Sequence, residues 1–143
     1  MSSSRLSPVN EGEGRIRWQV GGKDVPSTER TLLVQHTLRS GQAISYPGHV
    51  VVMGDVNPGA EVKAGGNIMV LGCLRGTAHA GAWGDEKAVV VAFRLRPTQL
   101  RIAHLISRSP DAAVEEPGEP EIARIRDGLV VIEPYLSFNE RRA

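Results

Sequence analysis

Apolar residues return at every sixth position along the middle of this chain. The series has nine members, all of them apolar: Leu32, Leu38, Ile44, Val50, Val56, Val62, Ile68, Leu74 and Ala80. An α-helix would repeat near 3.6 residues, and a half-buried strand would repeat at 2. The interval of six therefore predicts neither an ordinary helix nor an ordinary sheet.

A second repeat is three times as long, because several residue types recur 18 positions apart. The matching sets are Val34, Val52 and Val70, then Gly41 and Gly59, then Gly48, Gly66 and Gly84. The segments GQAISYPG (41–48) and GAEVKAGG (59–66) align residue for residue. Internal repeats of this kind take precedence over local predictions. They predict an all-β solenoid with about 18 residues per coil and three sides, each side contributing one inward apolar residue.

The repeated glycines are expected at the corners of this prism, where a positive φ or a close backbone approach is needed. Between corners each side holds three or four strand residues, at a rise of about 3.3 Å per residue. The aromatic content of only 4% fits this architecture. A narrow three-sided interior has room for branched aliphatic residues and alanine, but little room for rings.

The regular repeat ends after the third coil, where AWGDEK (82–87) interrupts it. We expect two plain strands after it, at residues 88–95 and 99–106. One face of the second strand would hold Leu100, Ile102, His104 and Ile106. Further on, Asp127-Gly128 lies between two alternating apolar runs, which is a strong signal for a hairpin. This C-terminal hairpin is predicted to close or cap the coil.

The segments outside the coil have the composition of loops. Residues 1–13 are rich in Ser, Gly, Pro and Glu and predict a disordered lead-in, followed by one short strand at 15–20. Residues 109–121 combine Pro and Gly with five acidic residues and predict a linker. The expected organisation is a largely disordered lead-in at 1–30, a β-helix domain at 31–134 and a tail at 135–143.

Composition and charge exclude several classes of function. The net charge of +1 gives no general argument for nucleic-acid binding. The single cysteine, Cys73, cannot form an internal disulfide and suits a reducing compartment. No signal-peptide pattern and no apolar run near the roughly 20 residues of a membrane span are found, so we expect a cytoplasmic protein. The four histidines show no metal-ligand spacing, and the Gly-rich stretch 54–66 lacks the GKS or GKT of a phosphate loop.

Two motifs in the repeat resemble a known protein family. RSGQ (39–42), followed by GDVNPGAEVKAGGNIMVLGCLRGTAHAGAWGD (54–85), is similar to the C-terminal domain of MinC, the bacterial septum-site determining protein. The similarity extends from about Thr31 to Pro134. It implies a right-handed, three-sided β-helix that forms a homodimer, and the apolar alternation in residues 88–106 is the face predicted for that dimer.

The resemblance also implies a function. Members of the family bind MinD, the membrane-associated ATPase of the same system, when MinD carries ATP. Together the two proteins prevent FtsZ from forming septa away from midcell. The chain would therefore be a component of a cell division inhibitor, without catalytic activity or cofactor. It would be cytoplasmic and reach the inner face of the membrane only indirectly, through MinD.

The resemblance assigns residues to this interaction. MinD-binding positions are Arg39, Ser40, Gly41 and Gly59, with secondary partner contacts at Gln42 and Arg75. The spacing of 18 stacks Gly41 on Gly59 at one edge of the prism, where the backbone of a partner could approach closely. Arg39 beside them offers a planar, bidentate donor for a carboxylate.

The chain departs from the family pattern in two places. Only residues 1–30 precede the coil, where family members have a larger N-terminal domain that performs most of the FtsZ inhibition. Thr77 stands where some relatives place an arginine implicated in contacting the FtsZ tail. Direct contact between this chain and FtsZ is therefore left open.

Other interpretations of the same residues remain open. RSGQ could be only a tight corner, Arg75 an ordinary surface arginine and Cys73 a packed thiol. An 18-residue, three-sided coil also suits hexapeptide acyltransferases, whose coil is left-handed and whose chemistry needs a histidine base. A bactofilin-like scaffold, in which β-helices stack into filaments, is a third class. The period alone does not decide the hand of the coil.

Overall fold

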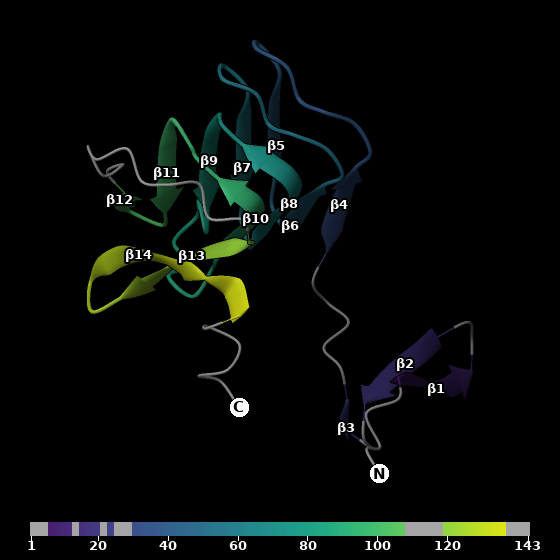
Figure 1. The fold of residues 1–143 in the computed structure, drawn as a ribbon. Coiled ribbons are helices and arrows are strands. Elements are labelled where there is room, and N and C mark those ends of the chain that lie inside the picture. The colour runs from purple at the N-terminus through teal and green to yellow at the C-terminus, as the bar shows by residue number, and fades with distance from the viewer. Residues whose placement is uncertain (1–5, 13–14, 21–22, 25–29, 108–118, 137–143) are drawn as a thin grey trace.

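The computed structural model describes residues 6–12, 15–20, 23–24, 30–107 and 119–136. Strands and turns make up almost all of this part of the chain (Figure 1). The strands form three sheets, of which two belong to the predicted solenoid. The third is a small N-terminal sheet of β1 (Leu6–Gly12), β2 (Arg15–Val20) and β3 (Lys23–Asp24).

Two sides of the solenoid are sheets. The six-stranded sheet has the order β14-β13-β10-β8-β6-β4. Its strands are β4 (Thr31–Val34), β6 (His49–Val52), β8 (Ile68–Leu74), β10 (Val90–Leu95), β13 (Glu121–Arg126) and β14 (Leu129–Pro134). The five-stranded sheet has the order β12-β11-β9-β7-β5. Its strands are β5 (Ala43–Tyr46), β7 (Glu61–Ala64), β9 (Thr77–Ala80), β11 (Gln99–Ile102) and β12 (Leu105–Ser107).

The third side is narrower and consists of two parallel bridges, Leu38 to Val56 and Val56 to Leu74. The parallel strands β4, β6, β8 and β10 mark four successive coils. In the first coils the register is 18 residues, because Leu32 pairs with Val50 and Val50 pairs with Ile68. The predicted three-sided coil is therefore confirmed. Crossover connections between parallel strands are right-handed in nearly all proteins, which agrees with the predicted hand.

The six-residue series forms the core. Most of its members are fully buried, and through the first two coils each stacks on its equivalent in the next coil, except Val62, whose partner in the third coil is Ala78. Burial of such aliphatic side chains stabilises the fold by about 1.5–3 kcal/mol each relative to exposure. The largest buried side chains are Leu38, Val50, Val52, Val56, Val62, Ile68, Val70, Leu74, Val90, Leu100, Ile102 and Ile122.

The third coil is shorter than the sequence predicts. Val62 pairs with Ala78, and Ala80 pairs with Ile102 in the following coil. Ala80 is therefore not the partner of Val62, although it is fully buried. The cause is the corner before β9, which contains only Arg75 and Gly76, whereas the preceding coil has four residues between Val56 and Glu61.

The glycine corners agree with the prediction except at one position. Gly66 donates its N–H to the carbonyl of Gly48, and Gly81 donates to the carbonyl of Gly66, both at 3.0 Å. Gly81, and not Gly84, is therefore the third member of this stack, since the third coil is shortened. Gly84 has φ +110° and lies in the loop 82–87. A side chain at Gly48 would collide with the backbone carbonyl of Arg30.

The strand predicted at 99–106 is interrupted at Ala103, which has φ +53°. The chain reverses there, and β12 returns antiparallel along β11, with Ile102 opposite Leu105. Leu100 and Ile102 face the core as expected, whereas His104 and Ile106 are exposed. In the described part of the chain no further coil follows β11 in this sheet, and β12 is its second partner instead.

The predicted hairpin at Asp127-Gly128 is confirmed. Both residues have positive φ, +53° and +77°, and join β13 to β14 with Arg126 opposite Leu129. Two central residues with positive φ make a type I′ turn, the connection that matches the twist of paired strands. β13 pairs antiparallel with β10, so the hairpin ends the parallel series and covers this end of the core.

The N-terminal expectation needs a correction. The strand at 15–20 is present, but residues 6–12 form β1, which pairs antiparallel with β2, where the composition predicted a disordered lead-in. The amino-acid composition of residues 6–12 does not show that β2 can form hydrogen bonds with their backbone N–H and C=O groups. The linker at 109–121 lies mostly outside the described residues, as does the tail beyond Leu136.

Candidate partner-binding edge

The corners that follow the narrow third side stack into one edge of the prism. In successive coils they are the residues 39–42, 57–60, 75–76 and 96–98. The first two have four residues, the third has two and the fourth has three. All six site residues predicted from the sequence lie on the first three of these corners.

The first corner is a tight turn. Gln42 donates its backbone N–H to the carbonyl of Arg39 at 2.9 Å, and Gly41 has φ +87°. A bond between the first and fourth residues, with a positive φ at the third, is typical of a type II turn. The side chain of Gln42 also turns back, because its Oε1 accepts the N–H of Arg39 at 2.7 Å. The turn holds Arg39 and Ser40 on the surface.

The second corner repeats this turn one coil later. Ala60 donates to the carbonyl of Asn57 at 3.0 Å, and Gly59 again has φ +87°. Pro58 occupies the second position of the turn, where its fixed φ is favoured. The sequence predicted a corner at Gly59, but the type of turn was not predicted, although proline followed by glycine is its ordinary signature.

The two turns are in direct contact, as the sequence predicted. Gly41 donates its N–H to the carbonyl of Gly59 at 3.0 Å. A Cβ atom at Gly59 would collide with the hydroxyl of Ser40. Gly59 is therefore required both by its positive φ and by the close approach of the first turn. This stacking brings Arg39, Ser40, Gly41 and Gly59 together.

Arg75 lies on the third corner of the same edge. Its N–H bonds to the carbonyl of Val56 at 2.8 Å, and its carbonyl accepts the hydroxyl of Thr98 at 2.7 Å. The side chain is exposed. Because this corner has only two residues, it cannot form the four-residue turn of the first two corners, and the stack of turns ends here.

The exposed chemistry of the edge is cationic and rich in hydrogen-bond donors. Within the described part of the chain, neither Arg39 nor Arg75 forms an ion pair, so both guanidinium groups face water. Ser40 and Gln42 add a hydroxyl and an amide. Such an edge can bind carboxylates and backbone carbonyls of a partner protein, since arginine forms bidentate, charge-assisted bonds with carboxylates.

The other candidate chemistry does not form a site. Among the residues that the structure describes, no three His, Cys, Asp or Glu side chains are close enough together to hold a metal ion. Cys73 is a free, half-buried thiol. A shallow pocket of about 400 Å³ lies at another edge, between Pro47-Gly48 and Gly65-Gly66, and it contains none of the predicted site residues.

Within the described ranges, no helix is long and apolar enough to cross a membrane.

Comparison with known proteins places this chain in a family. A family model described as "Septum formation inhibitor MinC, C-terminal domain" matches residues 32–135. A probable septum site-determining protein MinC of Heliobacterium modesticaldum is 70% identical over 107 residues, which is 75% of this chain and 37% of that protein. The corresponding protein of Moorella thermoacetica is 53% identical over 112 residues, which is 78% of this chain and 51% of that protein.

A solved structure has the same fold. It is titled "MinC:MinD cell division protein complex, Aquifex aeolicus" and matches with a TM-score of 0.71 and 40% sequence identity. The match covers 80% of this chain and 99% of the chain in that structure. In contrast, the chain spans between about a third and a half of the length of the two relatives named above. The family match covers the entire solenoid, from β4 to β14, and the chain belongs to the MinC family through its C-terminal domain.

Proposed function

We propose that this chain is a binding module of the division-site system that docks on ATP-loaded MinD through the stacked turns at Arg39–Gln42 and Asn57–Ala60. In this way it takes part in blocking FtsZ ring and septum formation away from midcell. The observation that supports the proposal is the contact between Gly41 and Gly59, which holds the two turns together and leaves Arg39 and Ser40 exposed beside them. The Aquifex aeolicus structure with the same fold is a MinC:MinD complex, which agrees with MinD as the partner.

The module acts by binding and has no catalytic step of its own. A hexapeptide-type acyltransferase would need a histidine base in a cleft between subunits. Three of the four histidines contact the backbone instead, since His36, His49 and His79 bond to Thr37, Asn67 and Ala103 at 3.1, 2.9 and 2.9 Å. A bactofilin-like filament would need both ends of the coil open, whereas the β13–β14 hairpin covers one of them.

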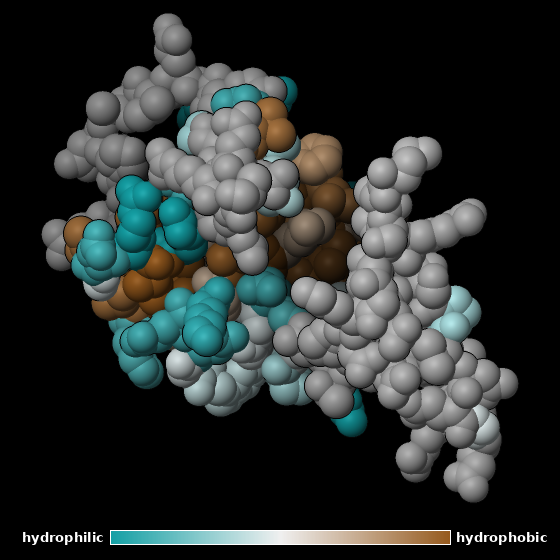
Figure 2. All heavy atoms as spheres, turned by 90° about the horizontal axis from the view of Figure 1, so that it is seen from below, coloured by the Kyte–Doolittle hydropathy of each residue, from teal (hydrophilic) through white to brown (hydrophobic). Residues whose placement is uncertain are grey.

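The module is also proposed to form a homodimer, through the outer face of the six-stranded sheet. Leu33, Val51, Met69 and Val91 lie opposite one another in register across four neighbouring strands of that face. Leu33 and Met69 are 50% and 41% exposed. A second apolar group on the outside of the solenoid consists of Met53, Leu71 and Phe93. Figure 2 views the molecule from below and shows hydrophobic atoms gathered in the middle of that view, with hydrophilic atoms beside them.

An exposed apolar row that crosses four neighbouring strands of a small domain indicates a protein–protein contact. A second copy is the occupant that fits, because a twofold interface packs the same patch against itself and apolar rows are complementary to one another. This assignment replaces the face expected at residues 88–106. That run divides between the two sheets, with β10 on the six-stranded sheet and β11 on the five-stranded sheet, so it cannot form one surface.

Localisation and the action on FtsZ follow from the partner. The chain would reach the inner face of the membrane by binding MinD there. Thr77 is paired with Glu61 and Gln99 in the five-stranded sheet and is half-buried. It offers no cation for an FtsZ contact, so Arg75 is the remaining candidate on the edge.

The test is binding to MinD from the same organism, measured by biolayer interferometry with ATP and with ADP. We expect binding with ATP and much weaker binding with ADP. Truncation of one partner of a buried charge pair costs about 2–5 kcal/mol, so Arg39→Ala should weaken binding by roughly 30-fold or more. Lys87→Ala is the matched control, because Lys87 is an exposed cation in the loop 82–87 and lies off the edge.

Three results would contradict the proposal. They are an absence of binding in both nucleotides, unchanged affinity in Arg39→Ala, and an equal loss in Lys87→Ala. The first would remove MinD as the partner, and the other two would remove the edge as the binding site.

A further inference from the structure

Backbone hydrogen bonds between successive coils recur along the candidate edge, and in the described part of the chain the first coil lacks the acceptor for its own. In each later coil, the residue that opens the corner donates its N–H to a carbonyl of the coil before. Asn57 donates to Leu38 at 2.9 Å, and Arg75 donates to Val56 at 2.8 Å. Arg96 donates to Leu74 at 2.9 Å. Arg39 opens the corner of the first coil, and among the described residues no earlier coil provides an acceptor.

The side chain of Gln42 supplies the missing acceptor. Its Oε1 lies 2.7 Å from the N atom of Arg39, the distance of a well-formed hydrogen bond. The Gln42 amide therefore takes the position that a carbonyl of a preceding coil would occupy. Together with the bond from Gln42 N to Arg39 O, it closes the turn from both sides. Arg39 is the residue whose backbone is held in this way.

The repeat contains an internal comparison. In the alignment of residues 41–48 with 59–66, Gln42 corresponds to Ala60. Alanine has no acceptor, and none is needed in the second coil because Asn57 already bonds to Leu38. A side-chain acceptor is thus found where the preceding coil is absent, and it is absent where the preceding coil is present.

We propose that Gln42 is a positioning residue for partner binding: its amide oxygen replaces the carbonyl of a preceding coil and thereby fixes the backbone from which Arg39 projects. The inference rests on the proposed binding of MinD. It differs from the sequence-based expectation that Gln42 is itself a partner contact. Gln42 acts on affinity through Arg39, and its amide NH₂ group is not needed for recognition.

Three variants separate positioning from contact. Gln42→Ala installs the residue found at the equivalent position of the second coil and removes the acceptor. Gln42→Met keeps the length and unbranched shape of the side chain but also lacks a strong acceptor. Gln42→Glu keeps an oxygen acceptor and removes the amide NH₂ group, since an ionised carboxylate only accepts. A direct contact through the NH₂ group predicts that the Glu variant fails, whereas positioning predicts that it is rescued.

Two measurements are made on each variant in the complete chain. Amide hydrogen exchange by NMR reports on the Arg39 N–H without any partner, and titration with ATP-loaded MinD gives the dissociation constant. A net hydrogen bond is worth about 0.5–1.5 kcal/mol, which corresponds to roughly 2- to 10-fold. We expect the Ala and Met variants to exchange the Arg39 amide faster and to bind MinD more weakly, each within that range. The Glu variant should stay within about twofold of the original chain in both measurements, with the MinD titration made at raised salt, where the added carboxylate is screened from the carboxylates of the partner.

The outcomes against the inference are specific. If the Arg39 amide hydrogen exchanges at the same rate in the Met variant, the hydrogen bond from the Arg39 N–H to the Gln42 side chain does not form. Weak MinD binding by the Glu variant, with Arg39 still protected, would show that the NH₂ group contacts the partner. Failure of the original chain to bind MinD would overturn the proposed function and the positioning role together. The exchange measurement would still show whether the Gln42 side chain accepts the Arg39 N–H, because it needs no partner.

Discussion

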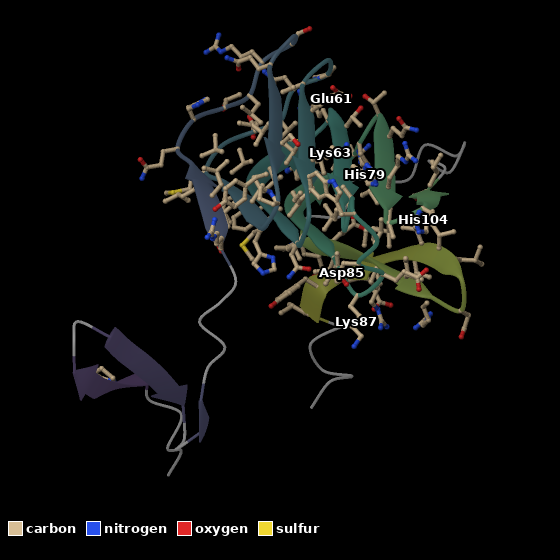
Figure 3. All side chains as sticks on the ribbon, turned by 180° about the vertical axis from the view of Figure 1, so that it is seen from behind. Glu61, Lys63, His79, Asp85, Lys87 and His104 are labelled. Atoms are coloured by element: carbon tan, nitrogen blue, oxygen red, sulfur yellow. The ribbon has the colours of Figure 1, made fainter. Side chains whose placement is uncertain are left out.

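The two sheets of the solenoid have the same interior and opposite exteriors. Inside, both stack fully buried aliphatic residues in register. Outside, the row across the six-stranded sheet is apolar from Leu33 to Val91. The corresponding row of the five-stranded sheet consists of Ser45, Lys63, His79 and Arg101. Figure 3 shows Glu61, Lys63 and His79 on this polar face.

The difference separates what the coil requires from what partners require. The inward positions must be aliphatic because they fill a narrow prism, and they carry no information about binding. The outward positions are free of that demand. An apolar row outside therefore indicates a covered surface, whereas Lys63, whose ammonium lies 5.3 Å from the centre of the Trp83 ring, belongs to a face suited to water.

The largest effect is expected from a charge placed on the apolar face. Met69 lies inside the row Leu33, Val51, Met69 and Val91, with Val51 opposite it on one side and Val91 on the other. An uncompensated buried charge costs about 3–5 kcal/mol, so Met69→Glu should weaken the dimer by more than about 100-fold. Analytical ultracentrifugation across a concentration series measures this.

The matched control for that variant is Ser45→Glu on the polar face. Ser45 lies next to Lys63 in register, so a carboxylate there meets a cation and water. The dimer should be unaffected. An intact dimer in Met69→Glu, or dissociation in Ser45→Glu, would show that the comparison of the two faces does not locate the interface.

A second prediction concerns the shared interior. Ile68 in the six-stranded sheet and Leu100 in the five-stranded sheet are 0% and 1% exposed. Truncation of either residue to alanine should cost about 2–5 kcal/mol of unfolding free energy, through lost burial and the cavity left behind. Urea denaturation measures this in the Met69→Glu background, where dimer dissociation does not contribute. A large cost on one side only would mean that the two interiors are not equivalent.

The smallest effect is a pH dependence at the end of the six-stranded sheet. Burial raises the pKa of the Glu121 carboxyl above its ordinary value of 4.5, with Arg96 lowering it and Glu119 raising it. A pKa raised in the folded state means that ionisation of Glu121 destabilises the fold. The stability contributed by the protonated carboxyl is therefore present at low pH and lost as pH rises through the pKa of the folded state. Glu121→Gln should therefore increase the melting temperature at pH 7, with a difference that shrinks below pH 4.5.

Thermal denaturation followed by circular dichroism between pH 3.5 and pH 8 tests the sign. A Gln variant that is less stable at pH 7, or a difference that does not change with pH, would contradict the assignment. Reversible melting at each pH is the condition for the comparison.

The sequence predicted the coil itself, because an 18-residue repeat shows both the number of sides and the inward positions. It failed at the third coil for a physical reason. Ala78 and Ala80 are both buried, and side chains alternate with a period of two. A slip of two residues therefore leaves the inward pattern unchanged, and the sequence cannot distinguish the two registers.

The structure of the candidate edge was predicted in part. The stack of Gly41 on Gly59 follows from the repeat, and the assignment to MinD follows from the resemblance. The side-chain bond from Gln42 to Arg39 could not be predicted in the same way. It depends on the absence of a preceding coil, and this becomes visible only when the hydrogen bonds of all four coils are compared.

The candidate partner-binding turn, residues 39–42, lies on the first coil, and this position has a consequence for dynamics. Each coil of a solenoid is stabilised mainly by its neighbours, and the first coil has only one. It should therefore open more readily than the rest, in the manner of a frayed end. A partner docked on Arg39 and Ser40 would act as a second neighbour for that coil. Binding would then be recorded as slower hydrogen exchange in β4 and β5, at a distance from the contact itself.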